Sequence, residues 1–102
     1  MDISSLMKQA QDFQQKMGEV QEELAKKTVS SEVGGGMVRV TVNGRQELLS
    51  IQIEREVINP DDAEMLQDLI IAAVNDAMGK AREMIQAEMG RLTGGLKIPG
   101  LT

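Results

Sequence analysis

The segment that follows Asn59 constrains the fold most, because it reads as one long helix with two separate apolar seams. Asn59 suits the N-cap, Pro60 suits the first helical position, and two aspartates favour the positive end of the helix dipole. A helix from Pro60 to about Leu92 extends about 48 Å. The first seam consists of Leu66, Ile70, Ala73, Ala77, Ala81 and Met84, and the second of Ile71, Val74, Met78, Ile85, Met89 and Leu92. A helix on one small sheet needs one apolar stripe, so two stripes predict two partners.

The N-terminal segment predicts a second long helix that ends at about Lys27, where a β-branched stretch begins. Its apolar residues are spaced alternately three and four apart over three heptads: Ile3, Leu6, Ala10, Phe13, Met17, Val20 and Leu24. We expect Ser4 and Ser5 to cap its start.

Three short strands are predicted between the helices. Residues 29–33 alternate, and Val38, Val40 and Val42 share one face of the next strand. Asn43-Gly44 is a strong hairpin signal. The returning strand places Leu49, Ile51 and Ile53 on one face. We expect these three residues and the valines to form the buried face of a small antiparallel meander.

Helix and strand lengths predict a homodimer. A strand of six residues spans about 20 Å, so both helices overhang the sheet. An overhanging apolar stripe is unstable in water unless a neighbour covers it. The sheet together with the first helix is one partner for the second helix, and a second copy of the chain is the other. The predicted fold class is α+β: an α-β-β-β-α protomer in which two long helices flank the meander. We expect one domain, residues 1–92, and a flexible tail, residues 93–102, that contains glycine and proline.

Three consecutive glycines, Gly34 to Gly36, raise the question of a phosphate-binding loop. A P-loop leads from a strand into a helix and places a lysine after its last glycine. Here the glycines lead into MVRVTVN, which alternates like a strand, and Arg39 stands where the dinucleotide pattern requires glycine. We interpret the glycines as a turn or bulge between two strands.

Composition excludes most catalytic chemistry. The chain has 102 residues, a net charge of −5 and neither cysteine nor histidine, so disulfides, imidazole ligands and the usual activated nucleophiles are absent. The acidic cluster of Asp61, Asp62 and Glu64 fits the start of a helix better than a metal site. No signal peptide or membrane span is visible. We expect a soluble intracellular protein that is not an enzyme, with no cofactor and no small-molecule substrate.

Four collinear segments resemble one known family. LMKQAQ, GGGMVRVTVNG, DDAEMLQDLIIAAVNDA and LTGGLKIPG occur in this order, and together they are similar to the YbaB/EbfC family of bacterial nucleoid-associated proteins. The resemblance implies a tweezer-like homodimer in the cytoplasm, at the nucleoid. It also implies binding to double-stranded DNA with little or modest sequence preference and an influence on gene expression and nucleoid organisation.

The negative net charge conflicts with the large basic surface that is usual for such a function, so any contact with DNA depends on a local patch. The resemblance favours Lys8, Arg39 and Arg45, which stand in its LMKQ, VRVT and NGR segments, and we add Lys16 from the first helix. Phe13 belongs to the heptad seam, so no aromatic platform is available for single-stranded bases. The alternative is an acidic protein–protein adaptor or chaperone-like dimer that uses its long helices and eight methionines as the contact surface.

Overall fold

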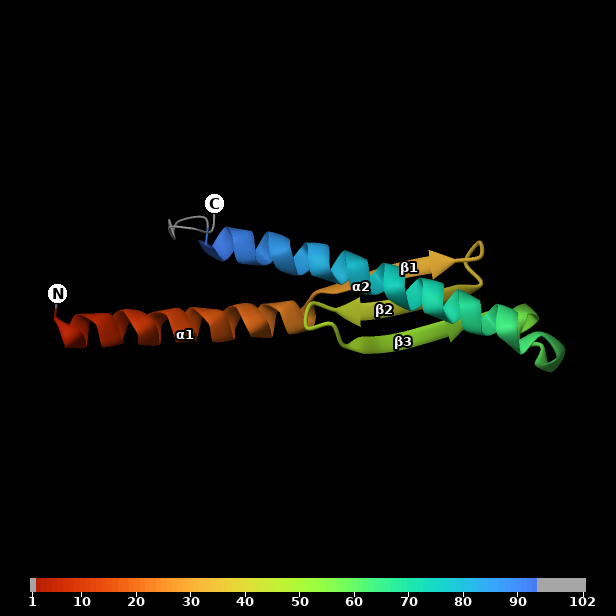
Figure 1. Ribbon diagram of the computed structural model, residues 1–102, viewed down its shortest axis with the longest axis horizontal. Coiled ribbons are helices and arrows are strands. Elements are labelled where there is room, and N and C mark those ends of the chain that lie inside the picture. Colours follow the sequence, from red (N-terminus) through yellow and green to blue (C-terminus); the bar gives the residue numbers. More distant parts are fainter. Residues whose placement is uncertain (1, 94–102) are drawn as a thin grey trace.

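The computed structural model describes residues 2–93 and has the predicted α-β-β-β-α order (Figure 1). The elements are α1 (Ile3–Lys26), β1 (Thr28–Val33), β2 (Val38–Asn43), β3 (Leu48–Ile53) and α2 (Ala63–Thr93). Short 3₁₀ turns at Arg55–Val57 and Pro60–Asp62 lead into α2. The fold class of the protomer is therefore confirmed.

The core lies between β2 and the middle of α2. The antiparallel sheet has the order β1-β2-β3, and α2 crosses one face of it, over β1 and β2. The fully buried residues of this core are Val38, Val40, Val42, Ala73, Ala77 and Ala81. Small alanines let the helix backbone approach the valine face closely, so the centre of the first predicted seam packs as expected.

The predicted burial of β3 was wrong for this chain. Leu49 and Ile51 are 52% and 39% exposed, and Ile53 is half-buried. A register shift pairs Val42 with Leu48, so Leu48 takes the place expected for Leu49. In addition, β3 is an edge strand that α2 does not cover. An apolar edge therefore faces outward.

Two turns differ in detail from their sequence signals. Gly34, Gly35 and Gly36 have φ angles of 65°, 69° and 90°, so the glycine run is the β1–β2 turn, built in a conformation that side chains resist. Asn43-Gly44 does begin the β2–β3 hairpin, but its loop is longer than two residues because β3 starts at Leu48.

The helix ends also differ slightly from the prediction. Asp2, rather than Ser4 or Ser5, caps α1, and its carboxylate accepts the amide of Ser4. Asn59 does act as an N-cap, but for the 3₁₀ turn that precedes α2. The helix α2 continues to Thr93, one residue into the predicted tail; the rest of that tail lies outside the described residues.

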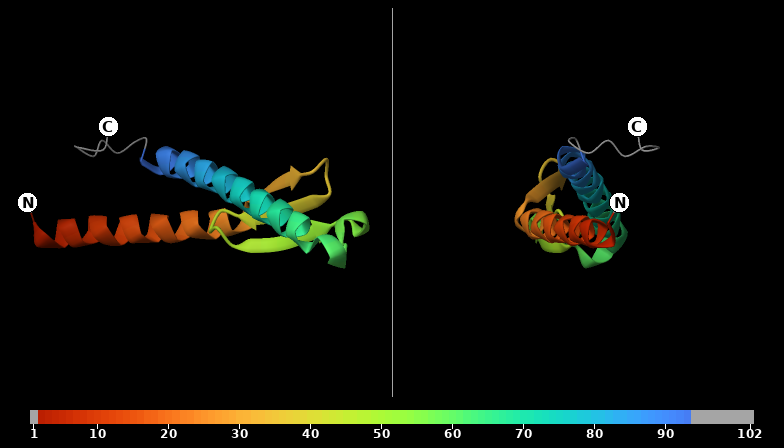
Figure 2. Two further views of the ribbon diagram at one scale, coloured as in Figure 1. Left: turned by 45° about the vertical axis from the view of Figure 1, so that its right-hand side comes forward. Right: turned by 90° about the vertical axis from the view of Figure 1, so that its left-hand side faces the viewer.

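Both long helices extend beyond the sheet on the same side (Figures 1 and 2). The molecule measures 69 × 24 × 17 Å along its principal axes. The expectation that α1, together with the sheet, covers one stripe of α2 was wrong: within Ile3–Lys26, Leu24 is the one buried residue. We call residues 2–27, which include α1, and residues 82–93 of α2 the arms, and residues 28–81 the body.

Candidate nucleic-acid interface

The β2–β3 loop holds the C-terminal end and C-cap of α1, residues 24–27, which we call the root of α1. The amide of Gly44 donates to the carbonyl of Leu24 at 2.8 Å and to that of Lys27 at 3.0 Å, so it gives a hydrogen-bond donor to carbonyls at the C-terminal end of the helix. Asn43 is buried and fixes the loop, because its Oδ1 accepts the amides of Arg45 and Glu47 at 2.9 and 3.0 Å. The direction of the α1 arm is therefore set by the turn that the sequence signalled as a hairpin.

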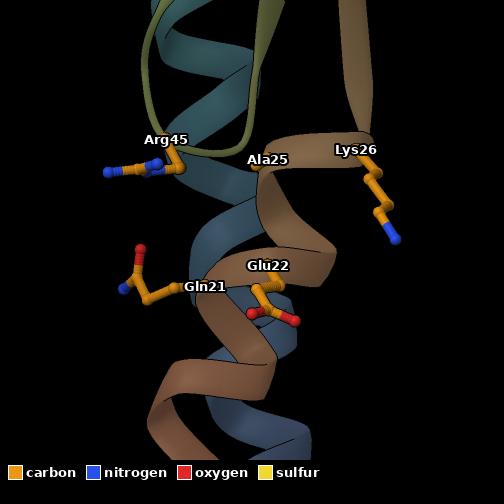
Figure 3. Close-up of a pocket in the computed structure, with 5 residues that line it drawn as sticks. All are labelled: Gln21, Glu22, Ala25, Lys26 and Arg45. Atoms are coloured by element: carbon orange, nitrogen blue, oxygen red, sulfur yellow. The ribbon is translucent and has the colours of Figure 1, made fainter.

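Arg45 lies beside the last two turns of α1. With Gln21, Glu22, Ala25 and Lys26 it lines an open hollow of about 600 Å³. Figure 3 shows Arg45 and Gln21 extending on one side of α1 and Lys26 on the other. Neither cation forms an ion pair with a described residue. The root of α1 thus presents two unpaired positive charges next to the arm.

The other predicted residues are more widely separated. Lys8 and Lys16 are exposed on α1 and have no ion pair within residues 2–93. Arg39 lies near the opposite end of β2 from the α1 root and pairs with Glu32, its cross-strand neighbour on the outer sheet face. The structure therefore places Lys8, Lys16 and Arg45 along α1 and at its root, and it does not bring Arg39 to them.

The central part of α2 is joined to β1 by polar contacts. The Ser31 hydroxyl donates to the Asp76 carboxylate, and Lys80 lies 3.6 Å from the same carboxylate. Lys80 also donates to the carbonyl of Ser30 at 3.1 Å. The Ser31 hydrogen bond, supported by the Lys80 charge, lowers the pKa of Asp76. Asp76 and Lys80 are four residues apart on one helix, a spacing that favours an ion pair. Glu22 and Lys26 have the same spacing but form no ion pair.

A second contact joins the root of α1 to the α2 arm. Lys27, the C-cap residue of α1, pairs with Glu88, and Arg91 lies 3.3 Å from the same carboxylate. The Lys27 hydrogen bond and the positive charges of Arg91 and Lys27 lower the pKa of Glu88 although its burial opposes this. Glu88 thus stays charged where it is largely removed from water.

Charge is divided unevenly between arms and body. In the arms the basic residues nearly balance the acidic ones. These are Lys8, Lys16, Lys26, Lys27, Arg82 and Arg91 against Asp2, Asp12, Glu19, Glu22, Glu23, Glu83 and Glu88. In the body the acidic residues are in clear excess. These are Glu32, Glu47, Glu54, Glu56, Asp61, Asp62, Glu64, Asp68 and Asp76 against Arg39, Arg45, Arg55 and Lys80. Most of the net negative charge therefore belongs to the body.

Neither a metal-binding cluster nor a membrane-spanning helix is found in the described part of the chain. Residues 2–93 contain no group of three or more acidic side chains arranged to hold a metal ion. None of the helices within this range has the length and apolar character needed to cross a bilayer.

Comparison with known proteins identifies the family. The sequence matches the YbaB/EbfC DNA-binding family over residues 1–96. The chain belongs to this family. It is 58% identical, over 98% of its length and 95% of the relative's, to a nucleoid-associated protein of Pelotomaculum thermopropionicum. A nucleoid-associated protein of Syntrophobacter fumaroxidans is 59% identical over 93% of this chain and 86% of its own.

A solved structure has the same fold as this YbaB/EbfC protein. The uncharacterized protein HP0035 of Helicobacter pylori superposes with a TM-score of 0.81 at 27% identity, covering 90% of this chain and 97% of that one. YbaB/EbfC is a DNA-binding family, not a family of enzymes. The family assignment made from four sequence segments is confirmed.

Sequence reasoning missed two features of this interface. The contact of Gly44 with α1 and the pairing of Lys27 with Glu88 both join residues that are distant in the sequence. The only local signal was the Asn43-Gly44 dipeptide, which predicted a turn but not what the turn supports.

Proposed function

We propose that this protein binds double-stranded DNA as a homodimer, with little or modest sequence preference, through phosphate contacts from its arms. We place it in the bacterial cytoplasm at the nucleoid, where it influences nucleoid organisation and gene expression. The observation that carries the proposal is the division of charge in a chain of a DNA-binding family. The body is acidic, and the cations Lys8, Lys16 and Arg45, which have no ion pair within residues 2–93, lie on or beside α1.

Exposed apolar surface supports the homodimer. On α1, Ile3 is 73% exposed and Phe13 is 43% exposed, although both belong to a regular heptad seam. Leu49 and Ile51 are exposed on β3, next to its free edge. Large exposed apolar side chains of this kind often mark interfaces between proteins, and a second copy of the chain would cover them.

Contact through the backbone of DNA explains how a protein of net charge −5 can bind it. Phosphate contacts depend on the local field and not on the sum of charges. The body would repel the duplex, so binding is directed to the arms. Lysine and arginine on an exposed helix reach phosphates without reading base edges, which accounts for low sequence preference.

A salt titration tests the binding mode. Affinity for a random duplex of about 30 base pairs is measured by fluorescence anisotropy between about 50 and 200 mM salt. Each phosphate contact contributes about −0.9 to the slope of log K against log salt concentration, so removing the arm cation Lys16 by Lys16→Gln in both protomers makes the slope about 2 units less steep. The matched control is Arg55→Gln, which removes the same charge from the acidic body and leaves the slope unchanged. Equal effects of the two variants would contradict binding through the arms.

The assembly has its own test. Sedimentation at micromolar concentration is expected to give a dimer for the natural chain and a shift toward monomer for Phe13→Asp, because a charge in the seam opposes burial. Gln14→Asp introduces the same charge one residue away, outside the seam, and keeps the dimer. A monomeric natural chain at that concentration would refute the dimer.

An acidic adaptor is the second candidate. The observation that favours it is exposed Ile58 and Met65 beside the acidic start of α2, where Met65 and Leu69 line an open hollow with Asp62, Glu64 and Asp68. If the natural dimer fails to bind duplex DNA at tens of micromolar in low salt, this candidate replaces the first.

A further inference from the structure

The Lys27–Glu88 pair differs from the other ion pairs in where it lies. Asp76 and Lys80 join α2 to β1 over the sheet, whereas Lys27 is the one residue between α1 and β1. Glu88 is in the arm of α2. The pair therefore links the C-terminal end of α1 to the arm of α2.

Burial also sets Glu88 apart. The Glu88 side chain is 10% exposed and that of its partner Lys27 is 40% exposed. Every other side chain in an ion pair of the described residues is at least 47% exposed. A carboxylate that is removed from water needs charged partners, and separating it from them is unfavourable. Glu88 therefore resists any movement of α2 that takes it away from Lys27.

The second partner of Glu88 lies on its own helix. Arg91 is three residues further along α2, so its contact with Glu88 moves with the helix and places no restraint on α1. Of the two cations, only Lys27 connects the carboxylate to another element.

We infer that Glu88 is a positioning residue that, through Lys27, fixes the separation and direction of the two arms and hence the geometry in which they meet DNA. This inference rests on the proposed function for its consequence at DNA, but its effect on the arms is independent of DNA. Two arms that contact one duplex bind it bivalently, and bivalent binding is weakened when the spacing is no longer preset.

The first test measures DNA affinity, which a positioning role and a simple charge effect change in opposite directions. Glu88→Gln and Glu83→Gln each remove one negative charge from the α2 arm, and Glu83 is exposed and forms no ion pair within residues 2–93. Electrostatics alone would tighten DNA binding equally in both variants. If Glu88 positions the arms, Glu83→Gln binds as tightly as the natural protein or more tightly, and Glu88→Gln binds about tenfold more weakly. Tighter binding by both variants would overturn the inference.

The second test measures the arms directly. The chain has no cysteine, so Gln11→Cys on α1 and Gln86→Cys on α2 provide two spin-labelling sites. Labelled chains are mixed with a large excess of unlabelled chains, so that each dimer carries one labelled copy. Pulsed electron–electron double resonance on the labelled chain without further substitutions is expected to give a narrow distribution of distances between the two labels.

Substitution of the two partners supplies the matched comparison. Lys27→Gln and Arg91→Gln each remove one cation from the same carboxylate. Lys27→Gln is expected to broaden or shift the distance distribution, and Arg91→Gln to leave it unchanged. Lys27 is partly exposed, so this variant keeps the test valid if Glu88→Gln does not fold. Identical distributions for Lys27→Gln and the natural chain would refute the inference. If neither the natural chain nor any variant binds DNA but the distances change as stated, the proposed function fails and the positioning role stands.

Discussion

Gly44 is predicted to tolerate no side chain, even though its backbone conformation is an ordinary one. A Cβ atom at this position would lie 2.6 Å from the carbonyl oxygen of Leu24 and 2.9 Å from its Cβ. The nearest atom belongs to the backbone of α1, so it cannot turn away as a flexible side chain would. Gly44→Ala therefore forces the β2–β3 loop and the root of α1 apart.

The magnitude follows from two contributions. Forcing an extra carbon into a packed site costs about 1–3 kcal/mol. Displacement of the loop also weakens the hydrogen bonds from the Gly44 amide to Leu24 and Lys27, and a hydrogen bond of this kind contributes about 0.5–1.5 kcal/mol. The free energy of unfolding is expected to fall by about 2–4 kcal/mol.

Urea unfolding followed by circular dichroism measures this change, with every variant at the same protein concentration because association also stabilises the fold. Gly18→Ala is the matched control: a Cβ at Gly18, in the middle of α1, meets nothing within 4 Å. This control is expected to raise the free energy of unfolding by about 0.5–1 kcal/mol, because alanine favours a helix over glycine. If Gly44→Ala unfolds at the same urea concentration as the natural chain, the close approach of the loop to α1 is wrong.

Three further predictions concern the sheet and its contacts with α2. Gly35→Ala is expected to lower the free energy of unfolding by about 1–2 kcal/mol through backbone strain alone, because Gly35 has a φ of 69° and open space around it; calorimetry measures the loss, and the left-handed turn would be refuted by an unchanged transition. Ala77→Leu is expected to lower the free energy of unfolding by about 1–3 kcal/mol by overpacking against the valine face, while Ala72→Leu on the exposed side of α2 changes it little. Equal urea midpoints for the two variants would contradict the burial of Ala77 in the core. The carboxylates of Asp76 and Glu88 have lowered pKa values, so the stability they contribute is fully present above their ordinary pKa values of 3.8 and 4.5 and is lost as the pH falls through the lower folded-state values. The urea midpoint is therefore expected to drop with acidification below about pH 4.5, and less so in the Asp76→Asn, Glu88→Gln double variant; the same drop in both proteins would contradict this account.

The elements that sequence predicted well are those whose signals are local. Val38, Val40 and Val42 alternate, and a period of two places them on one face of a strand whatever packs there. The start of α2 is marked by Asn59 and Pro60, whose effects act within one turn. Even the failure to cap α1 at Ser4 is a displacement by two residues to Asp2.

What the sequence could not predict depends on contacts between distant segments. The register shift in β3 depends on the pairing of Val42 with Leu48, and this pairing decides which leucine shares the valine face. Likewise, no local pattern around Glu88 indicates that Lys27 lies beside it. The basic residues could be named one by one, but their separation along α1 and across β2 follows only from the direction in which α1 leaves the sheet.

The exposure of α1 has a consequence for how the chain behaves when it is dilute. Apart from Leu24, no residue of this 24-residue helix is buried, and a helix of this kind gains most of its stability from packing and not from its own propensity. In the proposed dimer, ordering of the arm and association of the two chains are then a single equilibrium. Below the dissociation constant the N-terminal quarter of the chain would lose its helix while the sheet and α2 stay folded. Cellular concentration would therefore determine how much of the protein carries a complete DNA-binding surface.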